Sequence, residues 1–345
     1  MRSIVRHLLE SGRMSNNSAL QLSYDENRQF QALVLGRAGL DLYPEPDGCK
    51  IRDALSFSSD LGGSAGNIAV AMSRAGAKAG LISAVSDDAV GNFVKQRLIN
   101  EGVDTSLIGT TSGDERTSLA LAEVRDSDCE VVIYRNNPAD LKVECNRRIE
   151  LTLADSSNLV VTGTSLIDPD SRDQVLQIMS LAKGGDCHVW LDLDYRAWNW
   201  PSLEHTRGVY RKAAALADVL IGNEEEFSIL THDIPSQIEQ CREHKQIMVL
   251  KRGSDGSSLY AGDACLDCGI YPATPLKPYG AGDAFLGNLL VRYMKTGDWQ
   301  QSVEAGSAAA SLVVSQRGCA NAMPTPNQLK SLQESGTMEP AARWS

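Results

Sequence analysis

Seven consecutive residues near the C-terminal end combine small side chains with one carboxylate: Lys277-Pro278-Tyr279-Gly280-Ala281-Gly282-Asp283. Apolar residues at helical spacing follow them and predict a helix. The start of a helix leaves backbone N–H groups unpaired and partly positive, and small residues let an anion approach these donors. Gly280, Ala281 and Gly282, named here the anion cradle, therefore predict an oxyanion site, with Asp283 as a candidate general base. A plain glycine-rich turn with an acid stabilising the helix start is an equal alternative at this point.

Polar residues near the first predicted strand can contact a hydroxyl-rich ligand. Arg37 and Asp41 follow that strand, and Gly62 and Gly63 precede the helical segment that contains Asn67. Adjacent glycines let the backbone approach a ligand closely, and Asp41 and Asn67 can exchange hydrogen bonds with its hydroxyl groups. Alternatively, Asp41 is an exposed loop acid and Asn67 a helix-start residue. Their occurrence at neighbouring strand ends favours a binding site.

Three arginines, Arg37, Arg135 and Arg196, follow predicted strands or a predicted hairpin. A lone arginine is usually solvated. Three at such positions can converge on one carboxylate, because the planar guanidinium group forms forked hydrogen bonds. Asp194 is expected to fix the geometry near Arg196.

Two further motifs fit either a ligand site or ordinary local structure. Asn223 and Glu226 have the spacing of a capping box, and they can equally lie near a hydrated Mg²⁺ ion and phosphate oxygens. Lys251, Gly253 and Gly256 follow another predicted strand, where the glycines can lie under a nucleotide or form a plain turn. The sequence leaves both pairs of alternatives open.

Short continuous apolar runs alternate with helical patterns along most of the chain. This alternation predicts an α/β fold with a mainly parallel sheet covered on both faces, where ligands bind beyond the carboxyl ends of the strands. The predicted strands are 32–36, 79–85, 158–163, 188–194, 218–223 and 247–251.

Two segments without a clear helical pattern, 40–61 and 115–136, interrupt this alternation. The second has the pattern of a hairpin with a polar turn at 125–128. Together they predict a small β-structured lid, which serves as a cover for the site, as a homodimer contact, or as both.

The chain is predicted to hold one domain, over residues 31–330. Residues 1–30 are expected to form a mobile N-terminal extension and residues 331–345 a C-terminal tail. The first thirteen residues lack the long apolar core of a secretion signal. An organellar transit segment and an alternative start at Met14 both remain open for this end.

The composition is ordinary for a globular protein with a sizeable core. A net charge of -11 argues against a nucleic-acid or anionic-membrane surface, although clustered arginines can still bind an anionic substrate. No apolar run approaches the length of a membrane span. The eight cysteines show no zinc-site spacing, so free thiols in a reducing cytoplasm are expected.

Four motifs in order resemble the ribokinase-like (PfkB-type) carbohydrate kinases. They are GGSAGN (62–67), N-x-x-E (223–226), KRGSDG (251–256) and GAGD (280–283), and the resemblance covers about residues 31–330. It implies a three-layer fold with a mainly parallel central sheet and a small β-structured lid.

The resemblance also implies roles for the site residues. Asp283 would take the proton from the acceptor hydroxyl as it attacks the γ-phosphoryl group of ATP, and the amides of the anion cradle would stabilise the transferred group. The remaining positions implied are sugar contacts for Asp41, Gly62, Gly63 and Asn67, a magnesium–phosphate site for Asn223 and Glu226, and a nucleotide site for Lys251, Gly253 and Gly256.

Finer features resemble one branch of the family, which phosphorylates the sugar acid 5-dehydro-2-deoxy-D-gluconate in myo-inositol catabolism. They are GRAGLDLYP, YRNNPADL, LDYRAWNW and the late Asn-Ala-Met-Pro at 321–324. This branch would give the three arginines a carboxylate to bind. The alternatives are a kinase for 2-dehydro-3-deoxygluconate, a fructokinase or ribokinase, and a non-catalytic sugar sensor on the same fold.

One position departs from the family pattern. Many relatives have Asp-Thr before the cradle, where the acid helps to hold a monovalent cation, whereas this chain has Lys277-Pro278. A lysine ammonium group can replace that cation electrostatically, so turnover without potassium is expected.

Overall fold

The computed structural model describes residues 21–342 except 23, 26, 126–128 and 278. Most of the segment predicted to be a mobile extension, and the centre of the predicted hairpin turn, lie outside these residues.

Nine strands of the described chain form the central sheet, in the order β13-β12-β11-β10-β9-β8-β1-β4-β5. The strands from β11 to β5 are parallel, while β12 and β13 run antiparallel at one edge. All six predicted runs form strands of this sheet. The bounds are β1 (Ala32–Leu35), β4 (Ala79–Ser86), β5 (Ile108–Thr111), β8 (Asn158–Thr162), β9 (His188–Asp192), β10 (Val219–Asn223), β11 (Ile247–Lys251), β12 (Ser257–Ala261) and β13 (Ala264–Cys268).

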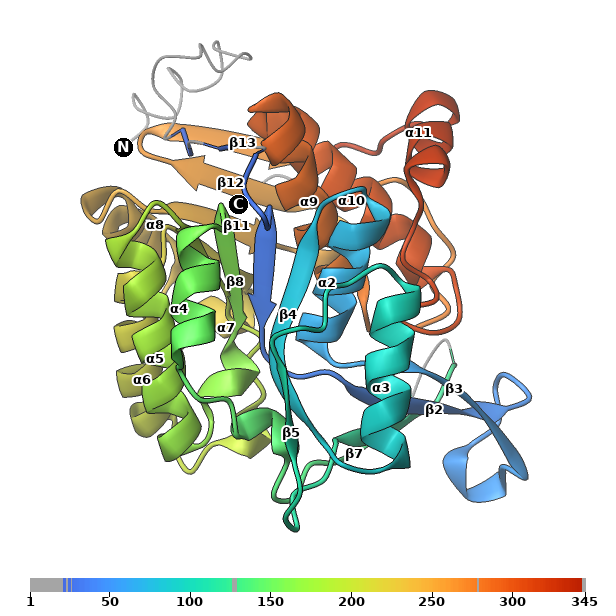
Figure 1. The fold of residues 1–345 in the computed structure, drawn as a ribbon. Coiled ribbons are helices and arrows are strands. Elements are labelled where there is room, and N and C mark those ends of the chain that lie inside the picture. The colour runs from blue at the N-terminus through green and yellow to red at the C-terminus, as the bar shows by residue number, and fades with distance from the viewer. Residues whose placement is uncertain (1–20, 23, 26, 126–128, 278, 343–345) are drawn as a thin grey trace.

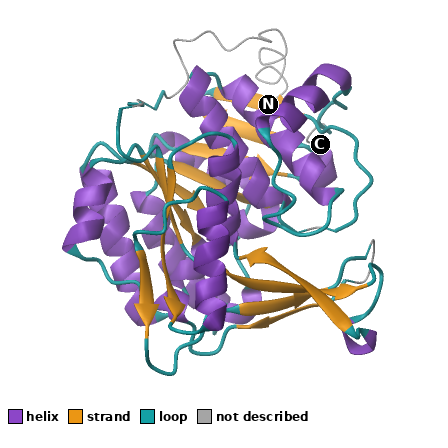
Figure 2. Ribbon diagram, turned by 45° about the vertical axis from the view of Figure 1, so that its right-hand side comes forward, coloured by secondary structure: helices purple, strands orange, loops and turns teal. Residues whose placement is uncertain are grey.

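Helices cover both faces of the sheet and give the predicted three layers (Figures 1 and 2). Each layer of helices buries its own apolar cluster against the sheet. On one face lie α4 (Arg147–Ala154), α5 (Pro169–Gly184), α6 (Leu203–Leu216), α7 (Glu224–Phe227) and α8 (Ile234–Glu243). On the other lie α2 (Ser64–Arg74), α3 (Ala89–Asn100), α9 (Ala281–Thr296), α10 (Trp299–Val314) and α11 (Pro326–Ser335).

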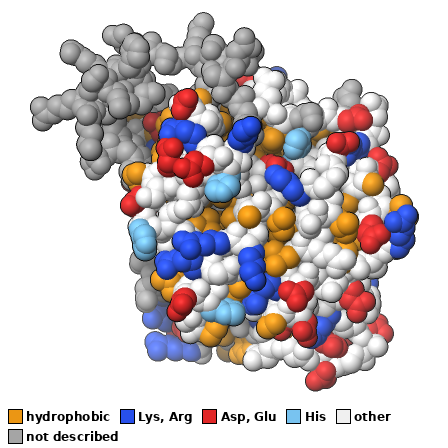
Figure 3. Space-filling model, turned by 90° about the vertical axis from the view of Figure 1, so that its left-hand side faces the viewer, with side chains coloured by type: hydrophobic (Ala, Val, Ile, Leu, Met, Phe, Trp, Pro, Cys, Tyr) orange, Lys and Arg blue, Asp and Glu red, His pale blue; other side chains and the backbone are white. Residues whose placement is uncertain are grey.

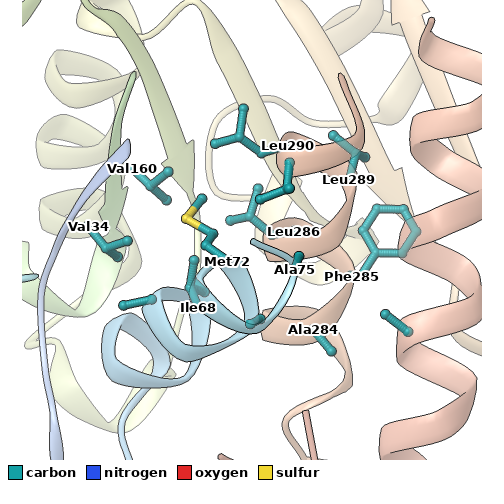
Figure 4. Packing of buried hydrophobic residues seen from close by; sticks show 14 of the residues in the cluster. Val34, Ile68, Met72, Ala75, Val160, Ala284, Phe285, Leu286, Leu289 and Leu290 are labelled. Carbon is teal, nitrogen blue, oxygen red and sulfur yellow. The ribbon is translucent and has the colours of Figure 1, made fainter. Parts of the chain in front are cut away.

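Helices α2 and α9 pack closely against each other beside the sheet. Ile68 and Met72 of α2 face Leu286 of α9 in the apolar cluster (Figure 4). A Cβ atom at Gly287 would lie 2.6 Å from the Cβ atom of Ala71, so a glycine is needed for this approach. The packing places the first turns of the two helices side by side.

A second, four-stranded sheet, named here the small sheet, has the order β3-β2-β6-β7. It projects to one side of the central sheet (Figure 1). Its strands come from the two segments predicted to form a lid: β2 (Gly39–Glu45), β3 (Ser56–Gly62), β6 (Leu119–Ala122) and β7 (Val131–Tyr134). Asp41 lies within β2, inside the segment predicted to be β-structured, and it is buried, so the alternative of an exposed loop acid is wrong.

Short 3-10 helices occur in several connections, and one of them lies between β2 and β3, where no helix was expected. They are η1 (Ile51–Asp53), η2 (Ala139–Leu141), η3 (Gly163–Leu166), η4 (Ala197–Asn199) and η5 (Gly253–Asp255). The residues after α11 return to the domain, where Glu339 pairs with Ile270.

The described helices and surface give two further observations. None of these helices has both the length and the apolar character needed to cross a membrane. On the face formed by α5, α6 and α8, Lys and Arg side chains are interspersed with Asp and Glu side chains (Figure 3).

Candidate active site

A cavity of about 920 Å³ lies beyond the carboxyl ends of β1, β9, β10 and β11, with β6 and β7 of the small sheet along its border. The chain therefore brings most of the predicted site residues to one place. Those that line the cavity are Arg37, Asp41, Gly63, Asn67, Arg135, Arg196, Asn223, Glu226, Lys251, Gly253, Gly280, Gly282 and Asp283.

Three predicted site residues are absent from the lining of this cavity. A Cβ atom at Gly62 would lie 1.9 Å from Oδ1 of Asp41, so this glycine makes room for the carboxylate. Gly256 has φ 92° at the turn into β12, and its Cβ position is 2.2 Å from the carbonyl oxygen of Cys268. Ala281 is the first residue of α9.

The anion cradle forms the start of α9. Gly280 precedes the helix with φ 86°, in the left-handed region that glycine adopts without strain, and no described side chain caps this start. A Cβ atom at Gly282 would lie 3.3 Å from Nζ of Lys251, so the lysine ammonium group approaches the backbone of the cradle. Backbone N–H groups and a cation therefore face the same part of the cavity, as an anion site requires.

Asp283 lies in the first turn of α9 and accepts a 2.9 Å hydrogen bond on Oδ2 from Nδ2 of Asn67. Burial raises the pKa of Asp283 to about 6, and the nearby carboxylate of Asp194 adds to this shift. A carboxylate with this pKa is still ionised at neutral pH and accepts a proton more readily than an ordinary aspartate.

Asp41 projects into the cavity from β2 and is 8% exposed. The Tyr43 hydroxyl donates to its Oδ2 at 3.2 Å, whereas Oδ1 is buried and has no hydrogen-bond partner among the described residues. Burial raises the pKa of Asp41 to about 6, and the positive charge of Arg37 opposes this shift. A buried acceptor without a partner at a cavity wall suits a ligand hydroxyl group.

Lys251 lies between two carboxylates at the ends of β9 and β10. Its Nζ is 3.2 Å from Oδ1 of Asp192 and 4.0 Å from Oε2 of Glu226. Burial disfavours the charged lysine, but the two carboxylates outweigh this effect and raise its pKa. Burial also raises the pKa of Asp192, against the effect of Lys251. Lys251 is therefore held as an ammonium ion at the cradle.

The three predicted arginines line one cavity, but two of them already have acidic partners. Arg135 pairs with Asp140 in a buried ion pair. Arg196 lies 2.8 Å from Asp194 and 3.6 Å from Glu226, and the charge of Asp194 raises its pKa.

Arg37 differs from the other two arginines. Its NH1 nitrogen is buried without a hydrogen-bond partner within the described chain. Its positive charge opposes the rise in the pKa of Asp41, and Asp41 also lines the cavity. Arg37 therefore has donor capacity available for a ligand.

Asn223 and Glu226 form the capping box that their spacing allows. The Glu226 amide donates to Oδ1 of Asn223 at 2.9 Å, and the Asn223 amide donates to Oε2 of Glu226 at 2.8 Å. No group of three or more His, Cys, Asp or Glu side chains in the described part of the chain is placed to hold a metal ion directly. An ion at this position would therefore keep much of its water.

Sequence reasoning missed several residues of the site. Asp192, the partner of Lys251, is the last residue of β9 and follows an apolar run, which was the available signal. Trp198 and Tyr279 also line the cavity; both lie in stretches that the sequence analysis singled out, but neither was assigned a role there. Asp194 does fix local geometry as predicted, since it accepts a hydrogen bond from Ser64 and pairs with Arg196.

A second cavity, of about 440 Å³, lies beside α10. It is lined by Pro272, Ala273, Thr274, Pro275, Leu276, Ser311, Leu312, Ser315 and Leu332. Beyond the end of α10 at Val314 the chain leads to Cys319, which lines the first cavity.

Known proteins resemble this chain over most of its length. A family model described as pfkB family carbohydrate kinase matches residues 29–326. A relative from Photobacterium profundum, named 5-dehydro-2-deoxygluconokinase, is 36% identical over 318 residues, which cover 90% of this chain and 96% of the relative.

Solved structures show the same fold. A fructokinase with bound ATP from Xylella fastidiosa superposes with a TM-score of 0.78 at 24% identity, covering 88% of this chain and 98% of that chain. A ribokinase II from E. coli in complex with ATP and Mg²⁺ has a TM-score of 0.80 at 21% identity, covering 88% and 99%.

The buried Lys251–Asp192 pair makes a testable prediction about stability. In Lys251→Met the Asp192 carboxylate loses its partner, which should lower the free energy of unfolding by about 3 kcal/mol at pH 8. The loss of unfolding free energy should be smaller at pH 5. A carboxyl group such as Asp192, whose pKa is higher in the folded than in the unfolded state, destabilises the fold increasingly as the pH rises above its unfolded pKa.

Urea unfolding at the two pH values measures this difference. Lys330→Met, at an exposed lysine paired with Glu334 on α11, is the control and should change stability by less than about 0.5 kcal/mol. Equal losses for Lys251→Met at both pH values would contradict the prediction.

Proposed function

Because this chain belongs to the pfkB family of carbohydrate kinases, we propose that it transfers the γ-phosphoryl group of ATP to a hydroxyl group of a sugar acid. The proposed acceptor is 5-dehydro-2-deoxy-D-gluconate of myo-inositol catabolism, after the name of the relative described above. One observation carries the proposal: a carboxylate of raised pKa, an uncapped helix start and arginines line a single cavity.

Asp283 and Asp41 have separate tasks in the proposed reaction. The free Oδ1 of Asp41 accepts a hydrogen bond from one hydroxyl group of the sugar and orients it. Asp283, held by Asn67, accepts the proton of the attacking hydroxyl group. The backbone donors of the anion cradle stabilise the negative charge of the phosphoryl group in transfer.

Positive charge for the phosphates comes from Lys251, whose ammonium group lies against Gly282 of the cradle. Asn223 and Glu226 would hold Mg²⁺ through water, which suits a cation that keeps several waters and takes few protein ligands. When bound, Mg²⁺ neutralises part of the phosphate charge.

The arginines favour an acidic acceptor. Five carboxylates and four cations of the described chain line the cavity, so a basic side chain can bind a ligand only with donors that these carboxylates leave free. Arg37 has such free capacity, and Arg196 has a side chain that is 41% exposed and can reach a ligand while it pairs with Asp194. A ligand carboxylate between them would accept charge-assisted hydrogen bonds from both guanidinium groups.

The second cavity suits the adenine ring of ATP. Its walls are apolar or hydroxylic side chains from α10 and from residues 272–276. The Leu276 amide donates to the carbonyl oxygen of Val314 at 2.7 Å, so the segment that leads into the anion cradle is tied to the end of α10.

Replacement of the proposed base should stop the chemistry. Asp283→Asn keeps the shape and removes the proton acceptor, so kcat should fall about 10²- to 10⁴-fold while ATP and sugar-acid binding persist. A coupled ATP-consumption assay and calorimetry measure the two quantities, with Asp173→Asn on the exposed side of α5 as the control.

The same assay on the unmodified protein tests the function. The panel contains 5-dehydro-2-deoxy-D-gluconate, 2-dehydro-3-deoxygluconate, fructose and ribose. Binding of a sugar acid without ATP turnover would identify a sensor, and preference for a neutral sugar would refute the acidic substrate.

Loss of an arginine should weaken acidic acceptors selectively. Arg196→Ala and Arg37→Met should each raise KM for the sugar acid about 10- to 100-fold, since each removes a charge-assisted hydrogen bond. Arg147→Ala, at an exposed position on α4, is the control. Equal losses for acidic and neutral sugars would contradict the assignment.

We also propose that turnover does not need potassium. Lys277 is 1% exposed, and its ammonium group donates to the carbonyl oxygen of Tyr279 at 2.7 Å. Burial lowers its pKa, and the neighbouring Cys319 and Asp283 oppose that shift. Replacement of K⁺ by tetramethylammonium at constant ionic strength should leave kcat unchanged, whereas strict dependence on K⁺ would refute the proposal.

The small sheet is the proposed homodimer contact. Leu55, Phe57, Val131 and Tyr134 are exposed on or beside its strands, and apolar side chains gathered in this way mark interaction surfaces. Sedimentation velocity should show a dimer that Phe57→Asp dissociates and that Leu181→Asp, on α5, leaves intact. A monomeric unmodified protein would exclude this contact.

A further inference from the structure

Tyr279 joins the anion cradle to the small sheet. It immediately precedes Gly280, and its hydroxyl group donates a hydrogen bond to the backbone carbonyl oxygen of Glu123, the residue that follows β6. Its ring belongs with Leu276 to an apolar cluster that is otherwise built from Tyr43, Ala122 and Val124. The cluster therefore contains side chains from both sides of the junction.

Lys277 holds the backbone of Tyr279 as well. The buried ammonium group donates to the Tyr279 carbonyl oxygen at 2.7 Å and lies 5.3 Å from the centre of the tyrosine ring. Gly280 then takes its left-handed conformation and α9 begins. The residue before the cradle is thus fixed at its carbonyl, its ring and its hydroxyl group.

Glu123, whose carbonyl oxygen accepts the hydrogen bond from the Tyr279 hydroxyl group, is bound to several parts of the small sheet. The Glu123 carboxylate accepts hydrogen bonds from the Ile51 amide at 2.9 Å and the Glu130 amide at 3.2 Å, and it pairs with Arg125 at 3.0 Å. Ile51 lies between β2 and β3, and Glu130 precedes β7. Glu123 therefore connects both hairpins, and a movement of the small sheet would carry the partner of Tyr279 with it.

We infer that Tyr279 is a positioning residue. Through its contacts, the geometry of the anion cradle depends on the position of the small sheet, which covers the sugar. The inference rests on the proposed function, since it assigns a role within the proposed phosphoryl transfer. Tyr279 acts through Gly280: when the small sheet is docked, the hydroxyl group fixes the turn whose amides receive the phosphoryl group. Correct geometry of the cradle then depends on the same contact that closes the sugar side of the cavity.

The variant Tyr279→Phe tests this coupling, because it keeps the ring, the apolar cluster and the contact with Lys277 and removes only the hydroxyl group. We expect kcat for the sugar acid to fall about tenfold, in line with one lost buried hydrogen bond, and KM for ATP to stay the same. Tyr260→Phe, which removes the hydroxyl group of a half-buried tyrosine on β12, is the matched control and should change neither quantity.

Amide hydrogen exchange on the ligand-free protein separates coupling from a general loss of stability. In Tyr279→Phe, exchange should become faster in two segments far apart in sequence, 119–124 and 279–284, and stay unchanged elsewhere. Faster exchange in only one segment, in neither, or throughout the chain would overturn the inference, as would an unchanged kcat.

This second measurement needs no substrate. If the unmodified protein phosphorylates no member of the sugar panel, the proposed function fails while exchange still decides whether Tyr279 couples the two segments. If exchange is uncoupled but the panel shows kinase activity, the inference alone fails.

Discussion

The close packing of α2 against α9 is the constraint on which the site depends. It leaves no space for a side chain at Gly287, and it brings the first turns of two helices from distant parts of the chain together. Asn67 on one helix thereby reaches Asp283 on the other. The apolar cluster beneath holds both helices against the sheet, so burial of Ile68, Met72 and Leu286 supports the position of a polar pair above them.

The charges of the cavity form a nearly balanced set, and this balance decides what a ligand can bind. Buried carboxylates are tolerated because most have a cation or a hydrogen-bond donor within reach. Lys251 is committed to Asp192 and lies close to Glu226, while Arg135 is committed to Asp140. The remaining donor capacity, on Arg37, and the free oxygen of Asp41 are the groups that a sugar acid can satisfy. The preference for an acidic sugar then depends on the polar groups of the cavity that lack a partner, and not on a net positive charge of the cavity.

The two sheets contribute different parts of the site, one for phosphate and one for the sugar. The central sheet presents strand ends and helix starts, which provide the rigid donors and the ammonium group for phosphate. The small sheet covers the sugar side and meets the cradle through Tyr279. Since β6 and β7 have only four residues each and are partly exposed, the position of the small sheet depends on contacts of this kind more than on a core of its own.

The sequence by itself determined the alternation of strands and helices, the segments of the small sheet, and the helix start at residues 280–282, because these features depend on local spacing and on residues such as Gly280. It also determined the family, through four motifs in order. Only the tertiary structure decided that Asp41 is buried at the cavity, that Asp192 is the partner of Lys251, and that Arg135 and Arg196 have counter-charges of their own. The physical reason is that charge pairing depends on distances between side chains from separate elements, and those distances exist only once the helices and sheets have packed.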